Sequence, residues 1–281
     1  MTNRRNFIKS ASALALGTFG LSAIPSFGAP KRTPYGLILY TVRDEMKNDP
    51  VKTLEQVASI GYEVVEAAGY SDGKIYGMAP AEFKRRVESF GMKLISSHTG
   101  VTMENINQVI EDAQKAGLKY VVKPSLHART ADEYKKGAEE FNKFGELFNS
   151  AGIKFGYHNH SFEFKKTKGQ IPYDILLKET DPKLVTFEMD LLWITKGGHD
   201  PWEYFAKYPG RFQLWHLKDM EGTGRKEMTE VGNGVIDFDR IFSESKQAGM
   251  KYSFVEQDTC KNHTPLESIK ISLDHIKKKG F

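Results

Sequence analysis

Residues 93–123 read KLISSHTGVTMENINQVIEDAQKAGLKYVVK and contain two predicted strands with a predicted helix between them. The two ends, 93–98 and 119–123, are short runs rich in β-branched and other apolar residues, which is typical of strands. Between them, residues 103–116 place apolar side chains at helical spacing. Gly117 follows directly, and a glycine at this place can take the left-handed conformation that ends a helix. The stretch therefore predicts one strand–helix–strand unit of a parallel sheet.

The same alternation continues in both directions along the chain. Further strands are predicted at 35–40, 62–66, 153–158, 184–189, 212–217 and 252–256. Further helices are predicted at 50–60, 80–90, 131–150, 172–180, 201–207, 238–248 and 264–279. Eight such units indicate an α/β protein with a single (β/α)8 TIM barrel. A doubly wound open sheet is the alternative, but it usually has a glycine-rich loop after its first strand, and residues 40–44 (YTVRD) contain no glycine.

The first 29 residues have the pattern of a twin-arginine-type signal peptide. Residues 3–9 (NRRNFIK) carry paired arginines, residues 11–24 are mostly apolar, and small residues precede Ala29. A charged start, a short apolar middle and a small-residue end are typical of an export signal. The apolar run is shorter than the roughly 20 residues that a membrane span needs. We therefore expect a signal at 1–29, a barrel domain at 30–281, and a periplasmic or otherwise exported protein; an uncleaved anchor is the alternative.

Composition excludes several classes of protein. The chain has 281 residues, of which 40% are hydrophobic and 27% charged, which argues against an integral membrane protein, a fibre or a disordered chain. Its formal charge is +4, and the first 29 residues contribute three of the 40 basic residues and none of the 36 acidic ones, so the remainder carries +1. A nearly neutral domain has no general affinity for nucleic acid. Cys260 is the single cysteine, which excludes an intrachain disulfide and a cysteine-based zinc site.

Ionisable residues gather at the ends of the last four predicted strands, where active sites of such barrels form. They occur as the pairs His158/His160, Glu188/Asp190, His216/Lys218 and Glu256/Asp258. Residues two apart on a strand point to the same side, so these pairs should meet at one rim of the barrel. Asp190, His216 and Glu256 are suitable ligands for one divalent ion such as Mn²⁺, Zn²⁺, Mg²⁺ or Co²⁺. Either His158 or His160 could complete the set.

Several of these segments together resemble one known family. They are 39–44 (LYTVRD), 61–66 (GYEVVE), 157–160 (YHNH), 188–190 (EMD), 216–219 (HLKD), 231–238 (VGNGVIDF) and 255–256 (VE). In this order they resemble the xylose isomerase-like barrels, called sugar phosphate isomerases/epimerases, which include inosose dehydratases, ketose 3-epimerases and the endonuclease IV type of DNA-repair enzyme. The set is specific for this superfamily and not for one substrate.

The resemblance implies a metal site, and one residue of this chain differs from the family's ligand set. In the family, Glu, Asp, His and Glu at the ends of strands five to eight hold one divalent ion. Asp190, His216 and Glu256 match three of these positions, and His158 stands where the epimerases have the first glutamate. Because the epimerases exchange protons between two glutamates on opposite faces of one carbon, a histidine here disfavours plain 3-epimerisation and favours proton removal from one face, as in a dehydratase or lyase.

The resemblance also implies a reaction on a keto-sugar. Loss of an α-proton would give an enediolate, which a divalent ion stabilises as a Lewis acid. We expect Glu256 or His160 to take the proton, and Lys123 or Lys218 to offset negative charge on the oxygens. The substrate contacts that we expect are Tyr40, Glu66, His98, Glu188 and Trp193. Trp193 could stack on a sugar ring, with core packing as the alternative.

These observations leave four functions to compare. The first is an exported, metal-dependent carbohydrate isomerase or epimerase, and the second is a lyase or hydratase acting on 3-keto-glycosides or inososes. A DNA-repair endonuclease is disfavoured by the nearly neutral charge and the export signal, and the fourth is a sugar-binding barrel without catalysis. We expect the protein to bind a small sugar and no nucleic acid. After signal cleavage we expect no stable membrane insertion, and a homodimer is one possible oligomeric state.

Overall fold

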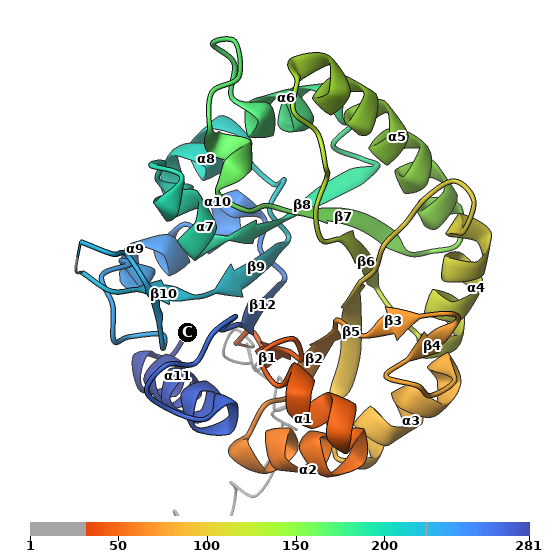
Figure 1. The fold of residues 1–281 in the computed structure, drawn as a ribbon, viewed down its shortest axis with the longest axis vertical. Coiled ribbons are helices and arrows are strands. Elements are labelled where there is room, and N and C mark those ends of the chain that lie inside the picture. Colours follow the sequence, from red (N-terminus) through yellow and green to blue (C-terminus); the bar gives the residue numbers. More distant parts are fainter. Residues whose placement is uncertain (1–31, 223) are drawn as a thin grey trace, which may run out of the picture. The chain divides into compact units, whose positions relative to one another are not determined.

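The computed structural model describes residues 32–222 and 224–281, and the predicted signal at 1–29 lies outside them. Within the described residues, eight parallel strands close into one barrel, which confirms the predicted (β/α)8 fold (Figure 1). The strands are β1 (Tyr35–Ile38), β2 (Val64–Ala67), β5 (Lys93–His98), β6 (Tyr120–Lys123), β7 (Lys154–His158), β8 (Val185–Asp190), β9 (Leu214–Leu217) and β12 (Tyr252–Val255). Neighbours in sequence are neighbours in the barrel, and β1 closes it by pairing with both β2 and β12.

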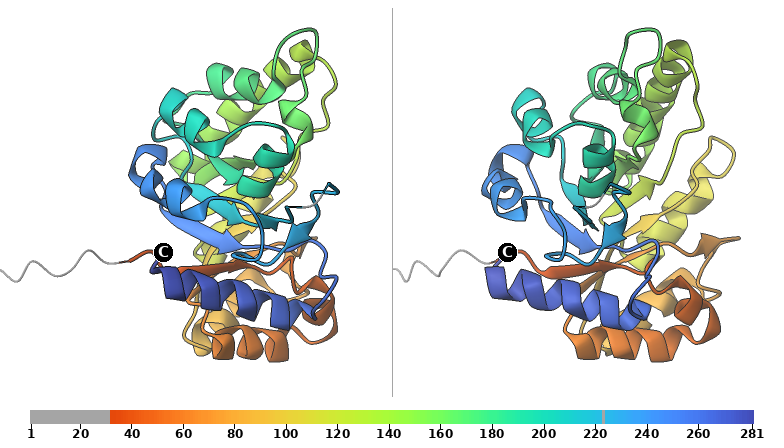
Figure 2. Two further views of the ribbon diagram at one scale, coloured as in Figure 1. Left: turned by 90° about the vertical axis from the view of Figure 1, so that its left-hand side faces the viewer. Right: turned by 60° about the vertical axis from the view of Figure 1, so that its left-hand side comes forward.

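Helices surround the barrel (Figures 1 and 2). They are α1 (Arg43–Asn48), α2 (Pro50–Ile60), α3 (Pro80–Ser89), α4 (Ile106–Ala116), α5 (Ala131–Ser150), α6 (Pro172–Glu179), α7 (Leu191–Lys196), α8 (Pro201–Lys207), α9 (Phe238–Ser243), α10 (Ser245–Ala248) and α11 (Pro265–Lys279). Gly117 ends α4 with φ +68°, as its place in the sequence predicts. Within the parts of the chain that the structure describes, no helix has the length and apolar character needed to cross a membrane.

The structure adds elements that the sequence pattern did not predict. The six-residue helices α1 and α7 are too short to show a clear periodicity. The segment predicted as one helix at 238–248 is interrupted at Glu244 and forms α9 and α10. Two small antiparallel sheets, β3–β4 (Tyr70–Ser71, Lys74–Ile75) and β10–β11 (Asp219–Met220, Met228–Thr229), extend from loops that follow barrel strands.

Apolar side chains fill the space on both sides of the barrel wall. Outside, Phe141, Phe144 and Phe148 of α5 pack against Phe155 of β7. Inside, one apolar cluster is formed by Ile38, Val64, Ile95, Tyr120, Val122, Leu214 and Phe254. Three of its members, Val64, Leu214 and Phe254, stand two positions before the ionisable residues Glu66, His216 and Glu256. The apolar cluster therefore forms an apolar floor beneath the polar groups at the carboxyl ends of the strands.

Candidate active site

Ionisable side chains from several strands meet inside the barrel at the carboxyl ends of the strands. They form two groups, and in each group the ligand atoms lie within 4.8 Å of one another. The outer cluster consists of His158, Asp190, His216 and Glu256, and the inner cluster consists of Glu66, His98, Glu188 and His216. Glu188 and Asp190 on β8 explain the two layers, because residues two apart on a strand point to the same side but lie roughly 6.6 Å apart along it.

The outer cluster is the set that the sequence predicts for a metal. His216 Nδ1 lies 2.6 Å from Glu256 Oε2, and His158 Nε2 lies 3.4 Å from Asp190 Oδ2. All four residues are buried, with exposed fractions of 5% or less. The two carboxylate oxygens of Asp190 have different partners. Oδ1 accepts hydrogen bonds from the backbone N–H groups of Leu192 and Trp193 at the start of α7, and Oδ2 faces the cluster. The helix thus fixes the orientation of the carboxylate.

The outer cluster fits a divalent cation. His216 Nδ1 and the Lys218 ammonium each lie 2.6 Å from Glu256 Oε2, so buried donor and acceptor atoms crowd together at this point. Two buried carboxylates and two imidazoles are the nitrogen and oxygen donors that zinc and related ions take in proteins. Burial alone would lower the pKa of His216, but the carboxylates of Glu188 and Glu256 raise it well above its usual range. The protein therefore concentrates negative charge at a point where a cation would relieve it.

Lys218 supplies one positive charge to this region. Its ammonium lies 2.9 Å from Asp190 Oδ2, 2.6 Å from Glu256 Oε2 and 3.1 Å from Asp258 Oδ2. Burial would lower the pKa of Lys218, but these three carboxylates raise it above its usual range, so the ammonium stays charged. Asp258 was not among our predicted site residues, although its spacing from Glu256 is the same signal that led to the other pairs.

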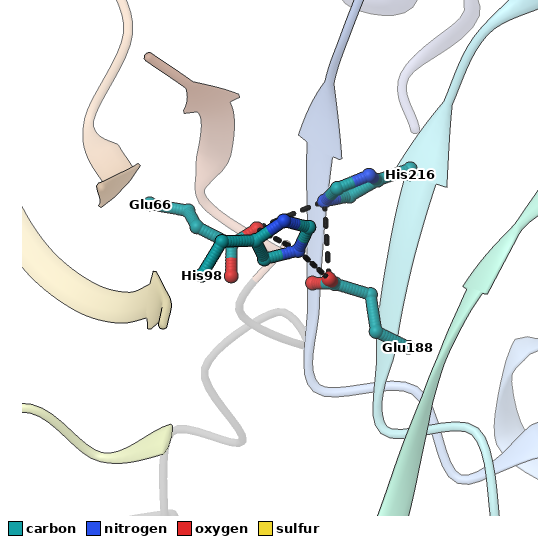
Figure 3. Close-up of side chains that lie close together, drawn as sticks. All are labelled: Glu66, His98, Glu188 and His216. Carbon is teal, nitrogen blue, oxygen red and sulfur yellow. Dashed lines mark hydrogen bonds and ion pairs between the residues drawn. The ribbon is translucent and has the colours of Figure 1, made fainter. Parts of the chain in front are cut away.

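The inner cluster lies deeper in the barrel, and its side chains point toward one another (Figure 3). His98 Nε2 lies 2.6 Å from Glu188 Oε2, and His216 Nε2 lies 2.8 Å from Glu66 Oε2 and 3.2 Å from Glu188 Oε2. Burial and the charge of Glu188 raise the pKa of Glu66 to about 7. We expected Glu66, His98 and Glu188 to contact substrate, but the structure pairs them with one another and with His216, and leaves Glu66 and Glu188 without exposed surface.

Comparison with known proteins identifies the family. A sequence profile of the xylose isomerase-like TIM barrels matches residues 54–279. The chain belongs to this family. It is 24% identical to an inosose dehydratase of Geobacillus kaustophilus over 80% of this chain and 85% of the relative.

Solved structures of this family agree with the fold. The crystal structure of a sugar phosphate isomerase/epimerase from Parabacteroides distasonis is similar with a TM-score of 0.76 and 32% identity, over 88% of this chain and 98% of that one. The IolI protein, solved with a bound zinc atom, is similar with a TM-score of 0.67 and 16% identity, over 88% and 99% of the two chains, which shows the shared fold alone.

His160 follows β7 at the carboxyl-terminal opening of the barrel and lies among aromatic side chains. Its ring stacks on Phe162, 5.3 Å between centroids, and lies 6.0 Å from Trp193. His160 Nδ1 is buried and has no hydrogen-bond partner within the described part of the chain. Burial and the neighbouring His158 lower the pKa of His160 to about 3, which keeps the imidazole neutral at neutral pH. Phe162, 44% exposed, was not predicted, because one aromatic residue in a loop gives no periodic signal.

Tyr40 also lies at this end of the barrel. It follows β1 and is 40% exposed, and the Arg43 guanidinium lies 4.5 Å from the centre of its ring. Because β1 pairs with β12, and the Arg43 guanidinium donates a hydrogen bond to the Asp258 carbonyl oxygen, Tyr40 stands beside the loop that follows the last strand.

The structure corrects our expectation for Lys123. Val122, the preceding residue of β6, belongs to the apolar cluster inside the barrel, so Lys123 points to the other side of the strand. Its ammonium donates a hydrogen bond to the Val101 carbonyl oxygen at 2.7 Å and lies 5.9 Å from the ring centre of Phe144 on α5. Lys123 is therefore directed away from both clusters, and Lys218 alone remains of the two lysines that we expected to offset negative charge.

Glu163 supports the turn that carries His160. Its carboxylate accepts hydrogen bonds from the Tyr157 hydroxyl at 2.7 Å and from the His160 backbone N–H at 2.9 Å. Burial raises the pKa of Glu163 from 4.5 to about 7. The folded state thus holds this proton more tightly than the unfolded state, so the group's contribution to stability is lost as pH rises from 4.5 through 7.

Replacing Glu163 with Gln should remove this pH dependence while keeping a polar group of the same shape. Relative to the wild type, the variant should gain up to about 3 kcal/mol in free energy of unfolding between pH 4.5 and pH 8. Urea unfolding at four pH values measures this, with the exposed Glu146→Gln on α5 as the control for losing one negative charge. A difference between Glu163→Gln and wild type that is constant across these pH values would contradict the assignment.

Proposed function

We propose that this chain is an exported, divalent-metal-dependent sugar isomerase or epimerase that acts through the enediolate of a keto-sugar. Relatives of the chain are named inosose dehydratase and sugar phosphate isomerase/epimerase, so an enzyme acting on carbohydrates is the supported class. The observation that carries the finer proposal is the outer cluster: two imidazoles and two carboxylates, all buried, at the carboxyl ends of four neighbouring strands.

His158, Asp190, His216 and Glu256 would hold the ion in this proposal. When bound, such an ion supplies a Lewis acid that stabilises negative charge on substrate oxygens. Glu256 or His160 takes the proton from the carbon next to the carbonyl group. Glu256 belongs to the outer cluster, and His160 lies two residues after its member His158. The Lys218 ammonium, held among three carboxylates, adds positive charge beside the reacting oxygens. Tyr40 and Trp193 contact the sugar from the mouth of the barrel.

A lyase or hydratase acting on 3-keto-glycosides or inososes is the second candidate. His158, 3% exposed and 3.4 Å from Asp190, supports it, because it takes the place where the epimerases have the first of their two facing glutamates. With one glutamate in place of two facing each other across the substrate, proton removal from one face followed by loss of a β-substituent is the simpler reaction. The inosose dehydratases among the relatives support the same candidate.

Solvent deuterium exchange tests both candidates. Protein loaded with Mn²⁺, Co²⁺, Zn²⁺ or Mg²⁺ is incubated in deuterium oxide with keto-sugars, 3-keto-glycosides and inososes, and the products are followed by NMR. Deuterium in a sugar of unchanged composition supports an isomerase or epimerase, and loss of water or of the aglycone supports a lyase. Glu256→Gln and His160→Gln distinguish the two candidate bases. Metal-loaded protein that binds these sugars but exchanges no proton would overturn both enzymes and leave a sugar-binding barrel.

Export and assembly are separate parts of the proposal. The paired arginines at 4 and 5 and the apolar run at 11–24 support export through a twin-arginine signal, with cleavage near Ala29 and a periplasmic product that has no stable membrane insertion. Mass spectrometry of the mature protein from cell fractions tests both the site of cleavage and the compartment. Light scattering of the same sample tests the homodimer.

A further inference from the structure

The inner cluster has three potential metal ligands of its own and shares a fourth, His216, with the outer cluster. Glu66, His98 and Glu188 belong to it and not to the outer cluster, and they come from three different strands. Four ligands around a zinc ion at about 2.0–2.1 Å lie roughly 3.3 Å apart. The inner pairs lie 2.6, 2.8, 3.2 and 3.8 Å apart, a range around that spacing. Small movements of these side chains would therefore suffice to surround a cation.

Two oxygens of this cluster have no hydrogen-bond partner among the described residues. They are Glu66 Oε1 and Glu188 Oε1, and both carboxylates are fully buried. A buried charged oxygen without a partner is costly, because it has lost the water that would solvate it. The Oε2 atoms of both carboxylates face the rings of His98 and His216, as the dashed lines in Figure 3 mark, and the Oε1 atoms are the second oxygens of the same carboxylates. A cation bound by these two carboxylates would compensate both.

The charges of the region point the same way. The two clusters and their neighbours contain the carboxylates of Glu66, Glu188, Asp190, Glu256 and Asp258. Lys218 is the one ammonium that contacts this group within the described residues. When all five carboxylates are ionised, Lys218 and one divalent ion in the outer cluster leave two negative charges, which protonated imidazoles or a second divalent ion would balance. Buried charges are tolerated when they are paired or coordinate a metal.

We propose that the inner cluster binds a second divalent cation, held by Glu66, His98 and Glu188 beside the ion of the outer cluster. His216 lies between the two sites, with Nε2 toward the inner cluster and Nδ1 toward the outer one. The second site does not depend on which sugar reaction the enzyme performs. Its role toward the outer site is to fix the His216 ring and to neutralise the carboxylates beneath it.

Two matched variants test the second site, because each removes one imidazole from one cluster only. His98→Gln alters the inner cluster and His158→Gln alters the outer one, while His216 stays in both. Wild type and variants are loaded with Zn²⁺, dialysed against a weak chelator and analysed for metal by mass spectrometry. We expect about two ions per wild-type chain and about one in each variant. Zinc anomalous diffraction from wild-type crystals, with one peak in each cluster, gives the same answer without a variant.

The other outcomes separate the two proposals. One ion per wild-type chain that His158→Gln loses and His98→Gln keeps would overturn the inner site and leave the outer metal of the proposed function intact. One ion that His98→Gln loses and His158→Gln keeps would support the inner site and overturn the outer ligand set. Wild type without bound ion would overturn both. Circular dichroism checks the folding of each variant, and Glu66→Gln replaces His98→Gln if the latter fails to fold.

Discussion

Replacing Asp190 and His216 together with alanine is expected to remove the outer metal ion and to lower the rate of deuterium exchange by at least about 10³-fold. The reason is that Asp190 Oδ2 and His216 Nδ1 are two of the four donor atoms of the outer cluster, and both are buried. With two donors gone, the remaining His158 and Glu256 cannot enclose an ion. Metal analysis of the purified variant beside wild type, followed by the exchange assay with saturating Mn²⁺, measures both effects.

Two further variants make this result specific. Asp190 Oδ1 also accepts the backbone hydrogen bonds at the start of α7, so Asp190→Asn, which keeps that oxygen, separates loss of metal from damage to the helix. His127→Ala with Asp132→Ala removes the same two residue types from exposed positions and should keep full metal content. A double variant in the cluster that still exchanges protons at the wild-type rate would exclude the outer cluster as the reaction centre.

Replacing Lys218 with Met should lower the free energy of unfolding of the metal-free protein by about 3–5 kcal/mol. The buried ammonium is in contact with Asp190, Glu256 and Asp258, and its removal takes away the one ammonium that these three carboxylates share. Added Zn²⁺ should reduce the difference from wild type, because an ion in the outer cluster replaces part of the missing charge. Urea unfolding with EDTA and with Zn²⁺ gives both values.

Lys207 on α8 offers a matched control for the loss of a lysine in an ion pair. Its ammonium lies 2.9 Å from Asp174 Oδ2, but its side chain is 49% exposed. Lys207→Met should therefore cost less than about 1 kcal/mol, with or without zinc. If Lys218→Met cost no more than Lys207→Met in EDTA, the buried carboxylates would not depend on this ammonium.

The barrel could be predicted from the sequence because its signals are local. Each unit, such as 93–123, carries its strand, helix and closing glycine within about thirty residues, and none of these signals depends on the rest of the fold. The meeting of Asp190, His216 and Glu256 could be predicted as well, since parallel strands in a barrel end on the same side. The short helices α1 and α7 could not, because six residues give too little periodicity.

The direction and depth of single side chains were not available from the sequence. Strands of a parallel barrel are buried on both faces, so the apolar residues of β6 do not reveal which face Lys123 shares. For the inner cluster, the missing quantity was the relative level of side chains on different strands. The spacing on β8 separates Glu188 from Asp190, but only the structure shows that Glu66 and His98 reach the level of Glu188.

The pairing of β1 with β12 also determines when, during synthesis of the chain, the barrel can close and the proposed outer metal site can be completed. β1 is made first among the strands and pairs with β12, which is made last and is followed directly by Glu256. A nascent chain that has not yet reached Tyr252 therefore has an open sheet and lacks one donor of the outer cluster. Ribosomes make the chain from its N-terminus, so an ion held by all four outer residues, as we propose, could be enclosed only after β12 and Glu256 have been made. Complete metal coordination at the proposed outer site would thus follow synthesis of all eight barrel strands.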